Sequence, residues 1–424
     1  MIFKFFLLVV ALLGAPLFII IATGAIAGFS QEDIDLAVIP IEIYRLAETP
    51  ILIAIPLFTF AGYLLGESKA PSRLVNLTNA LLGWLPGGLA IMALVTCAIF
   101  TAFTGASGVT IVALGALLFP ALKQAGYSER FNLGLITSSG SLGVLLAPSL
   151  PLILYGVVVQ QLGAEQPVSI DDLFLAGLLP GLLMIVMLSA YSMLQKREPI
   201  EQEQTADRSD VLKALRESIW EIPLPFVVLG GIYSGFFAVS EAAAITALYV
   251  FIVEVFILKE IRIRDLPRIM RESMVMVGGI LIILGLSLAL TNYMIDTEVP
   301  QQLFNTIKSY VDSKYTFLIL LNVFLLILGL MLDIFAALVI VVPIIFPIAM
   351  SYGINPVHLG IIFLANMQIG YFTPPVGMNL FIASYRFNRP VMELYRATLP
   401  YFFILLLAVL IITYWPGLSL FLLG

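Results

Sequence analysis

The sequence is poor in charge and in the side chains that most enzymes and metal sites use. Only 11% of its 424 residues are charged, and it contains one histidine, His358, and one cysteine, Cys97. A single cysteine excludes an internal disulfide. One cysteine and one histidine also exclude a Cys/His metal site, and a Ser-His-Asp triad would have to use His358. No Walker A pattern is present, so we expect no nucleotide cofactor.

Apolar residues, in contrast, are abundant. Hydrophobic residues make up 61% of the chain and the mean hydropathy is +1.06, whereas soluble domains are about 45–50% apolar. The apolar runs are continuous rather than alternating, which favours membrane helices over a transmembrane barrel. The sequence therefore predicts an all-α polytopic protein surrounded by a lipid bilayer. Residues 5–29 are predicted to form its first membrane helix rather than a cleaved leader.

The distribution of charge predicts the orientation. Residues 196–216 and 259–271 carry five Lys or Arg each. In residues 31–48, five of the six charged residues are acidic. Positively charged loops stay on the cytoplasmic side, so the two basic stretches are predicted inside and the acidic loop outside. Each basic stretch fits either a short amphipathic helix at the membrane interface or an ordinary solvated loop.

An internal repeat is the most informative feature. Its first copy has Phe119-Pro120, Gly134 and Pro148, which recur 226 to 227 residues later as Phe346-Pro347, Gly360 and Pro374-Pro375. Upstream of each Phe-Pro pair lies a charge-poor segment with a break, at 104–110 and at 329–333. The first of these belongs to a charge-free stretch, 74–122, that suits a helix followed by a re-entrant hairpin. Inverted repeats with broken helices are typical of secondary transporters.

These features divide the chain into five predicted parts. Residues 1–73 are scaffold helices, and residues 74–195 are a first transport repeat made of a hairpin and a broken helix. Residues 196–295 are a central scaffold with cytoplasmic interfacial helices. Residues 296–397 are the second transport repeat, and residues 398–424 form a C-terminal scaffold helix.

Small and hydroxylated residues surround the breaks of the first repeat. Glycine and proline free backbone carbonyls, and carbonyls with hydroxyls are hard oxygen donors. No carboxylate lies nearby in the sequence, which argues against calcium and favours sodium. The alternative is close helix packing through small residues. The predicted first sodium site consists of Thr104, Ser107, Gly108, Gly140, Gly143 and Pro148.

The second repeat offers a matching set with one acid. Asp333 is the only carboxylate between Lys314 and Arg386, and an intramembrane acid is a functional candidate because burying it is expensive. It could neutralise a cation, bind a proton, or cap the break. The predicted second sodium site consists of Gly329, Asp333, Gly370, Thr373 and Val376. The predicted substrate-binding residues are Ser139, Asn366 and Asp333. Glu241 is predicted to cap a helix that has Ser240 as N-cap.

Four motifs carry a resemblance to a known family. They are residues 103–108 (FTGASG), 143–151 (GVLLAPSLP), 172–181 (DLFLAGLLPG) and 370–377 (GYFTPPVG). With them the whole chain resembles the large membrane subunit of tripartite ATP-independent periplasmic (TRAP) transporters, the DctM type.

The resemblance implies a sodium-driven, elevator-type importer of a small organic acid, a carboxylate or a sulfonate, in the bacterial inner membrane. It implies two partners, a small four-helix membrane subunit and a soluble periplasmic substrate-binding protein, and no nucleic acid. It implies two sodium ions. One lies near Ser107, Gly108, Gly143 and Pro148, and the other near Gly329, Gly370, Thr373 and Val376.

Three other functions remain open from the residues. A single-component divalent-anion:sodium symporter would have a related fold and no binding protein. An intramembrane enzyme is disfavoured by the poor stock of catalytic side chains. A passive channel is disfavoured because proline- and glycine-broken repeats suit alternating access. Neighbouring genes for a binding protein and a small membrane protein would separate the importer from the symporter.

Overall fold

The computed structural model describes residues 10, 14–32, 34–83, 85, 87–162, 168–195 and 208–423, with no side-chain description for 208–210. All regular elements in these residues are helical. The helices before the middle of the chain are α2 (Leu17–Gln31), α3 (Val38–Ala47), η1 (Pro50–Ile53), α4 (Ala54–Glu67), α5 (Ala70–Leu82), α6 (Gly88–Thr104), α7 (Ser107–Gln124), α8 (Glu129–Ser139), η2 (Leu142–Leu145), α9 (Leu150–Gln161) and α10 (Ile170–Met193). Those that follow are α11 (Arg208–Glu217), α12 (Pro223–Tyr233), α13 (Val239–Phe251), η3 (Ile252–Ile257), α14 (Leu266–Asp296), α15 (Val299–Lys308), α16 (Lys314–Met331), α17 (Ile334–Ser351), α18 (Pro356–Gly370), α19 (Met378–Phe387), α20 (Val391–Tyr414), α21 (Gly417–Leu420) and η4 (Phe421–Leu423).

The helices confirm the prediction of a polytopic membrane protein. Among the described residues, eight are long and apolar enough to cross a membrane. A ninth span results if the pair Glu129–Leu145 and Leu150–Gln161, bent by 41°, counts as one. The first predicted membrane helix, residues 5–29, is described only in part, because residues 1–9 and 11–13 lie outside the described residues; α2 covers its second half.

The two basic stretches differ from each other. Of the first stretch, residues 196–207 lie outside the described residues, and 208–216 belong to the helix α11 (Arg208–Glu217). Its position at the membrane interface stays a prediction. Residues 259–271 are not a separate interfacial helix, because Lys259 has a positive φ of 54° and α14 begins only at Leu266. The arginines from position 268 onward therefore belong to the first turns of a 31-residue apolar helix.

The internal repeat is present as a repeat of helices. In each copy two helices form a hairpin, and a broken helix follows: α6 and α7 precede α8 and α9, and α16 and α17 precede α18 and α19. Helix α17 begins at Ile334, 227 residues after Ser107 begins α7, and the same offset relates their last residues. The packing is reciprocal, since α7 packs on α19 and α17 packs on α9. Such exchanged contacts are what a pseudo-two-fold axis between the copies requires.

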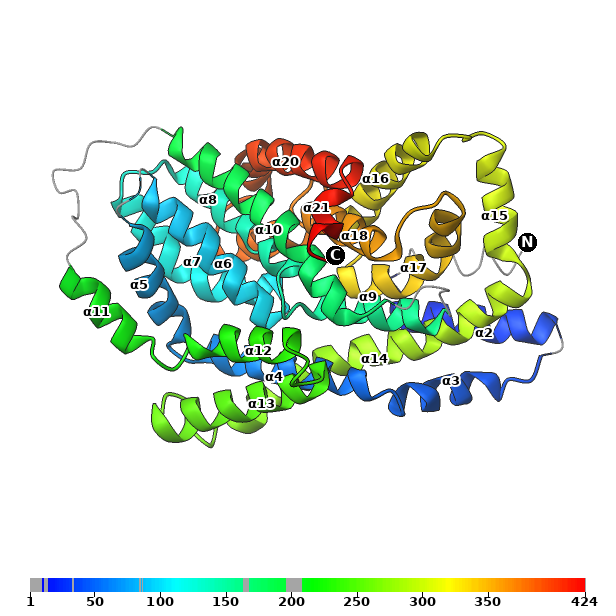
Figure 1. The fold of residues 1–424 in the computed structure, drawn as a ribbon, viewed down its shortest axis with the longest axis horizontal. Coiled ribbons are helices and arrows are strands. Elements are labelled where there is room, and N and C mark those ends of the chain that lie inside the picture. Colours follow the sequence, from blue (N-terminus) through cyan, green and yellow to red (C-terminus); the bar gives the residue numbers. More distant parts are fainter. Residues whose placement is uncertain are drawn as a thin grey trace.

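Five of the helices outside the repeats lie together. Figure 1 shows α2, α3, α4, α13 and α14 along one edge of the molecule, with the repeats above them, and α14 packs on α2, α3, α4 and α17. Helix α20, whose residues 398–414 belong to the predicted C-terminal scaffold helix, packs on α8, α10, α18 and α19. Three expected domain boundaries, after residues 73, 295 and 397, fall inside α5, α14 and α20.

A cluster of buried charges holds α5 at the edge of the repeats. The guanidinium of Arg73, whose side chain is 11% exposed, pairs with Glu221 at 2.5 Å, Glu260 at 2.6 Å and Glu254 at 3.3 Å. Glu221 lies in the segment before α12, Glu254 lies in η3, and Glu260 lies in the loop after η3. Because buried charges need partners, the cluster fixes α5 against the helices of the 208–260 region.

One close contact between α4 and the first repeat involves a glycine. A Cβ on Gly62 would lie 2.6 Å from the Cα of Thr104 and 2.8 Å from the carbonyl oxygen of Phe103. Only a glycine lets α4 lie this close to the end of α6.

We therefore expect Gly62→Ala to lower the free energy of unfolding of the purified protein in detergent by about 1–3 kcal/mol, the usual cost of overpacking, and to lower its melting temperature accordingly. The matched control is Gly278→Ala in α14, where an added Cβ meets nothing within 4 Å, and it should leave the melting temperature unchanged or raise it. Equal melting temperatures for the two variants would contradict the proposed contact.

Candidate ion and substrate site

The first hairpin turns at a two-residue connection, the first tip, made of Gly105 and Ala106. Helix α6 ends at Thr104 because Gly105 adopts a left-handed conformation, with φ of 65°, that suits glycine. Ala106 is extended, and α7 begins at Ser107. Among the described residues no side chain caps α7. The sequence predicted this break from its glycines.

The break of the first broken helix, residues 140–149, lies directly against this hairpin. The hydroxyl of Thr101 donates to the carbonyl oxygen of Gly140 at 2.9 Å and lies 2.7 Å from the hydroxyl of Thr110. A Cβ on Gly143 would lie 2.2 Å from the carbonyl oxygen of Ala98. A Cβ on Gly140 would also lie 3.3 Å from the carbonyl oxygen of Ser107. The predicted residues Ser107, Gly140 and Gly143 thus lie together where α6 ends, at Thr104, and α7 begins. Pro148 is buried beside them, two residues before Leu150, whose side chain a Cβ on Gly105 would meet at 2.4 Å.

One residue at the first tip was missed by the sequence reasoning. The hydroxyl of Ser107 donates to Oδ1 of Asn379 at 2.8 Å, and Nδ2 of Asn379 donates to the carbonyl oxygen of Thr137 at 3.3 Å. Asn379 belongs to α19 of the other repeat and is fully buried. A lone amide in the apolar segment 378–383 was the available signal, because burying an amide is costly unless it is hydrogen-bonded.

The second hairpin turns at Leu332 and Asp333, the second tip. The carboxylate of Asp333 accepts hydrogen bonds from the backbone N–H groups of Phe335 at 2.9 Å and Ala336 at 3.0 Å. Asp333 is thus the N-cap of α17, one of the roles left open for it. The N–H of Ile334 donates to the phenol oxygen of Tyr371 at 2.9 Å.

Two predicted glycines bring the second hairpin and the second broken helix into contact. A Cβ on Gly370 would lie 2.5 Å from the Cα of Gly329, so the backbones of α16 and α18 touch. In the second break, residues 371–377, the hydroxyl of Thr373 donates to the carbonyl oxygen of Ile369 at 2.7 Å. Val376 is 47% exposed, and only its backbone carbonyl could serve as a ligand.

The two broken helices also meet each other. The hydroxyl of Ser141, in the first break, donates to the carbonyl oxygen of Gln368, in the last turn of α18, at 3.1 Å. Gln368 is fully buried, and among the described residues its Oε1 has no hydrogen-bond partner. The first break therefore packs against the last turn of α18, which leads into the second break, in a buried polar region.

The two other predicted substrate-binding residues lie in this region but face protein groups. The hydroxyl of Ser139 donates to the carbonyl oxygen of Ile136 at 3.3 Å. Nδ2 of Asn366 donates to Oδ1 of Asn322 on α16 at 2.7 Å, while Oδ1 of Asn366 has no partner among the described residues. Their substrate contacts stay predictions.

Glu241 and His358 both make structural contacts, and the capping role predicted for Glu241 is confirmed. Glu241 accepts the N–H of Ala238 at 3.0 Å, so it caps the start of α13, although the N-cap is Ala238 and not Ser240. His358 is buried in α18, with Nδ1 at 3.1 Å from the hydroxyl of Ser419 and Nε2 at 3.3 Å from the carbonyl oxygen of Thr413.

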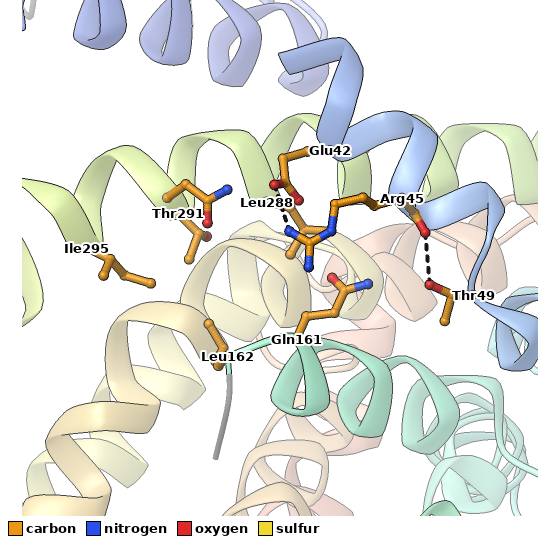
Figure 2. A pocket seen from close by; sticks show the side chains of 9 residues that line it. Glu42, Arg45, Thr49, Gln161, Leu162, Leu288, Thr291 and Ile295 are labelled. Carbon is orange, nitrogen blue, oxygen red and sulfur yellow. Dashed lines mark hydrogen bonds and ion pairs between the residues drawn. The ribbon is translucent and has the colours of Figure 1, made fainter. Parts of the chain in front are cut away.

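A small polar cavity lies away from the predicted sites. Its volume is about 110 Å³, and Figure 2 shows side chains of α3, α9 and α14 around it. Arg45 reaches into it and pairs with Glu42 at 3.0 Å. The cavity contains none of the predicted ion or substrate residues. It lies beside the acidic loop predicted to face the outside.

Comparisons with known proteins agree with this architecture. A family model described as the DctM component of the tripartite ATP-independent periplasmic transporter matches residues 3–418. The chain belongs to this family. It is 34% identical to the C4-dicarboxylate TRAP transporter large permease protein DctM of Pseudomonas aeruginosa, covering 90% of this chain and 88% of that one. It is 31% identical to an ectoine/5-hydroxyectoine TRAP transporter large permease of Ruegeria pomeroyi, covering 98% and 96%.

A longer relative and a solved structure add to this. The isethionate TRAP transporter permease protein DctMQ of Oleidesulfovibrio alaskensis is 35% identical over 88% of this chain, which covers 58% of that protein. The YdaH transporter of Alcanivorax borkumensis has the same fold, with a TM-score of 0.59 at 16% identity, covering 88% of this chain and 89% of that one.

The family membership settles the broad class. The chain is a TRAP transporter large permease, a multi-pass protein of the bacterial inner membrane, and not an enzyme. This confirms the resemblance read from the four motifs. The ion sites, the substrate contacts and the sodium itself stay predictions.

The capping geometry allows the roles of Asp333 to be separated. Asp333→Asn keeps the Oδ1 acceptor and removes the charge, whereas Asp333→Ala removes both. We expect Asp333→Ala to lower thermal stability by about 1 kcal/mol, the typical cost of losing an N-cap, and Asp333→Asn to lower it much less. Thermal unfolding in detergent without sodium measures this. Equal losses in both variants would mean that the charge, and not the cap, stabilises the fold.

Proposed function

We propose that this TRAP permease imports a small organic acid, driven by sodium, after a periplasmic substrate-binding protein delivers it. The substrate class rests on relatives whose names give C4-dicarboxylates, isethionate and ectoine. The single observation that supports the sodium coupling is the orientation of two hydroxyls, one beside the first tip and one in the second break. Ser107 and Thr373 both donate their protons to protein oxygens.

A hydroxyl whose proton is held by a protein acceptor keeps its oxygen lone pairs free. The nearest recorded oxygen to the Ser107 hydroxyl is the amide oxygen of Asn379, and amide, carbonyl and hydroxyl oxygens are all neutral. Neutral oxygens bind a monovalent cation without the several carboxylates that calcium requires. A sodium ion near Ser107, Gly108, Gly143 and Pro148 fits this donor set.

The second proposed sodium site has the same chemistry with one acid beside it. The Thr373 hydroxyl and the carbonyls released by the Pro374-Pro375 pair supply neutral oxygens. Asp333 uses Oδ1 to cap α17, and its negative charge still favours a cation nearby. Gly329, Gly370 and Val376 would complete the site with backbone oxygens.

The structure suggests how an elevator motion would divide the chain. We propose that the two repeats form the moving domain together with α10 and α20, since α20 packs on α8, α18 and α19. The hydroxyl of Tyr401 donates to the carbonyl oxygen of Phe131 at 3.0 Å, and that of Thr413 donates to Oδ1 of Asn322 at 3.2 Å. The static scaffold would comprise α2 to α4 and α12 to α14. The small four-helix membrane subunit would bind this scaffold, and the extra length of the DctMQ relative suits a fused second component.

Uptake into proteoliposomes tests the proposal. The chain is reconstituted with its small membrane subunit, and the binding protein is added outside with labelled C4-dicarboxylate, isethionate or ectoine. Uptake should require an inward sodium gradient and stop when choline replaces sodium, because the ion supplies the driving force. Equal uptake in choline without a proton gradient would refute sodium coupling. Strong uptake by the chain alone, with no binding protein, would favour the single-component symporter.

Removal of the Thr373 oxygen tests the second sodium site. Thr373→Val keeps the shape of the side chain and should raise the sodium concentration for half-maximal uptake about fivefold to a hundredfold, the equivalent of about 1–3 kcal/mol for one lost polar contact. The matched control is Thr246→Val in α13, because the Thr246 hydroxyl also donates to the carbonyl four residues earlier at 2.7 Å. If both variants show the same sodium dependence, Thr373 serves packing alone.

A further inference from the structure

The side chain of Asn379 holds the hydroxyl of Ser107 in one orientation. A carbonyl oxygen only accepts hydrogen bonds, so the contact at 3.3 Å with the carbonyl oxygen of Thr137 must use the amide nitrogen of Asn379. The amide oxygen then faces Ser107, at 2.8 Å. Since this oxygen also only accepts, Ser107 must donate, and its lone pairs point away from Asn379.

The opposite repeat has no equivalent of this contact. Position 152, which corresponds to 379 in the repeat, is an apolar and fully buried leucine in α9. Position 106, which corresponds to the capping Asp333, is an alanine. The second tip therefore carries its own polar group, whereas the first tip receives one from the other repeat. Internal symmetry explains why α7 packs on α19 as α17 packs on α9, but it does not explain the amide side chain of Asn379.

The backbone of Asn379 is itself anchored at the second break. Its N–H donates to the carbonyl oxygen of Tyr371 at 2.8 Å, and the phenol oxygen of Tyr371 accepts the N–H of Ile334 at 2.9 Å. Hydrogen bonds thus run from Ser107 through Asn379 and Tyr371 to the start of α17. The residue that orients the first tip is held in place by the second break and, through it, by the second tip.

We propose that Asn379 is a positioning residue for the first sodium site, through which the second repeat orients the Ser107 hydroxyl toward the ion. This inference rests on the proposed sodium coupling. Asn379 does not touch the ion; it acts by accepting the Ser107 proton. Its contribution should therefore vanish when the Ser107 hydroxyl is absent.

A double-mutant cycle tests this dependence. The variants are Ser107→Ala, Asn379→Leu and the double variant, and the readout is the sodium concentration that gives half of the sodium-induced rise in melting temperature, with choline keeping the ionic strength constant. Each single variant should raise this concentration about fivefold to tenfold, as for one lost ligand contact. The double variant should match Ser107→Ala alone. Multiplicative losses would overturn the proposal, because Asn379 would then act independently of Ser107.

A conservative variant separates positioning from packing. Asn379→Asp keeps the acceptor for Ser107 and loses the donor to Thr137. It should therefore bind sodium at least as tightly as the native protein. A loss of sodium affinity as large as in Asn379→Leu would indicate a purely structural role and would overturn the proposal. If Asn379→Leu does not fold, Asn379→Ala replaces it in the cycle. If sodium does not change the melting temperature of the native protein, the proposed sodium coupling is refuted. If the native protein responds to sodium but the losses of the two single variants multiply in the double variant, only the role of Asn379 is refuted.

Discussion

A helix that is interrupted inside a membrane leaves backbone N–H and C=O groups that lipid cannot satisfy. The rest of this structure depends on how the four interruptions in the two repeats meet that constraint. Each lies against another part of the repeats: the hydroxyl of Ser141 in the first break binds the carbonyl of Gln368, and the phenol of Tyr371 in the second break binds the N–H of Ile334. Glycines allow the required proximity, as at Gly329 and Gly370. The groups that must be shielded from lipid are also the oxygen donors that a cation needs, so stability and the proposed ion binding use the same atoms.

The two tips meet the constraint differently. Asp333 satisfies the first N–H groups of α17 with a side chain from its own hairpin. The first tip has Ala106 at that position, and the polar partner of Ser107 comes from Asn379 in the opposite repeat. A carboxylate placed at a helix start also complements the helix dipole, so the charge of Asp333 has a structural reason that is independent of transport. Symmetry of the backbone therefore does not imply symmetry of the chemistry.

The features predicted from sequence were those with a local signal. The hairpins and broken helices follow from glycines, prolines and continuous apolar runs, and the repeat follows from their constant offset. The contacts of Ser107 could not be predicted, because Asn379 lies 272 positions away in the sequence and only the folded chain brings the two together. The basic stretch after Lys259 was ambiguous for another reason: its arginines continue into a long membrane helix, and amphipathic spacing alone does not mark where a helix begins. The ionic cluster around Arg73 was missed because its acids are spread over three segments.

The contacts of α20 show why composition alone could not assign each helix to the moving or the static part of the proposed elevator. Its sequence is that of any membrane helix, and from its place at the end of the chain it was expected in the scaffold. Its polar side chains, however, bind the repeats: Tyr401 donates to the carbonyl of Phe131 in the first copy, and Thr413 donates to Asn322 in the second. Inside an apolar environment such hydrogen bonds are costly to break. The contact of α4 with the first tip is different, since it rests on the bare backbone of Gly62 against Thr104. In the proposed elevator, the boundary between the moving and static parts is therefore placed at the contact of Gly62 with Thr104 and not at α20, whose hydrogen bonds tie it to both copies.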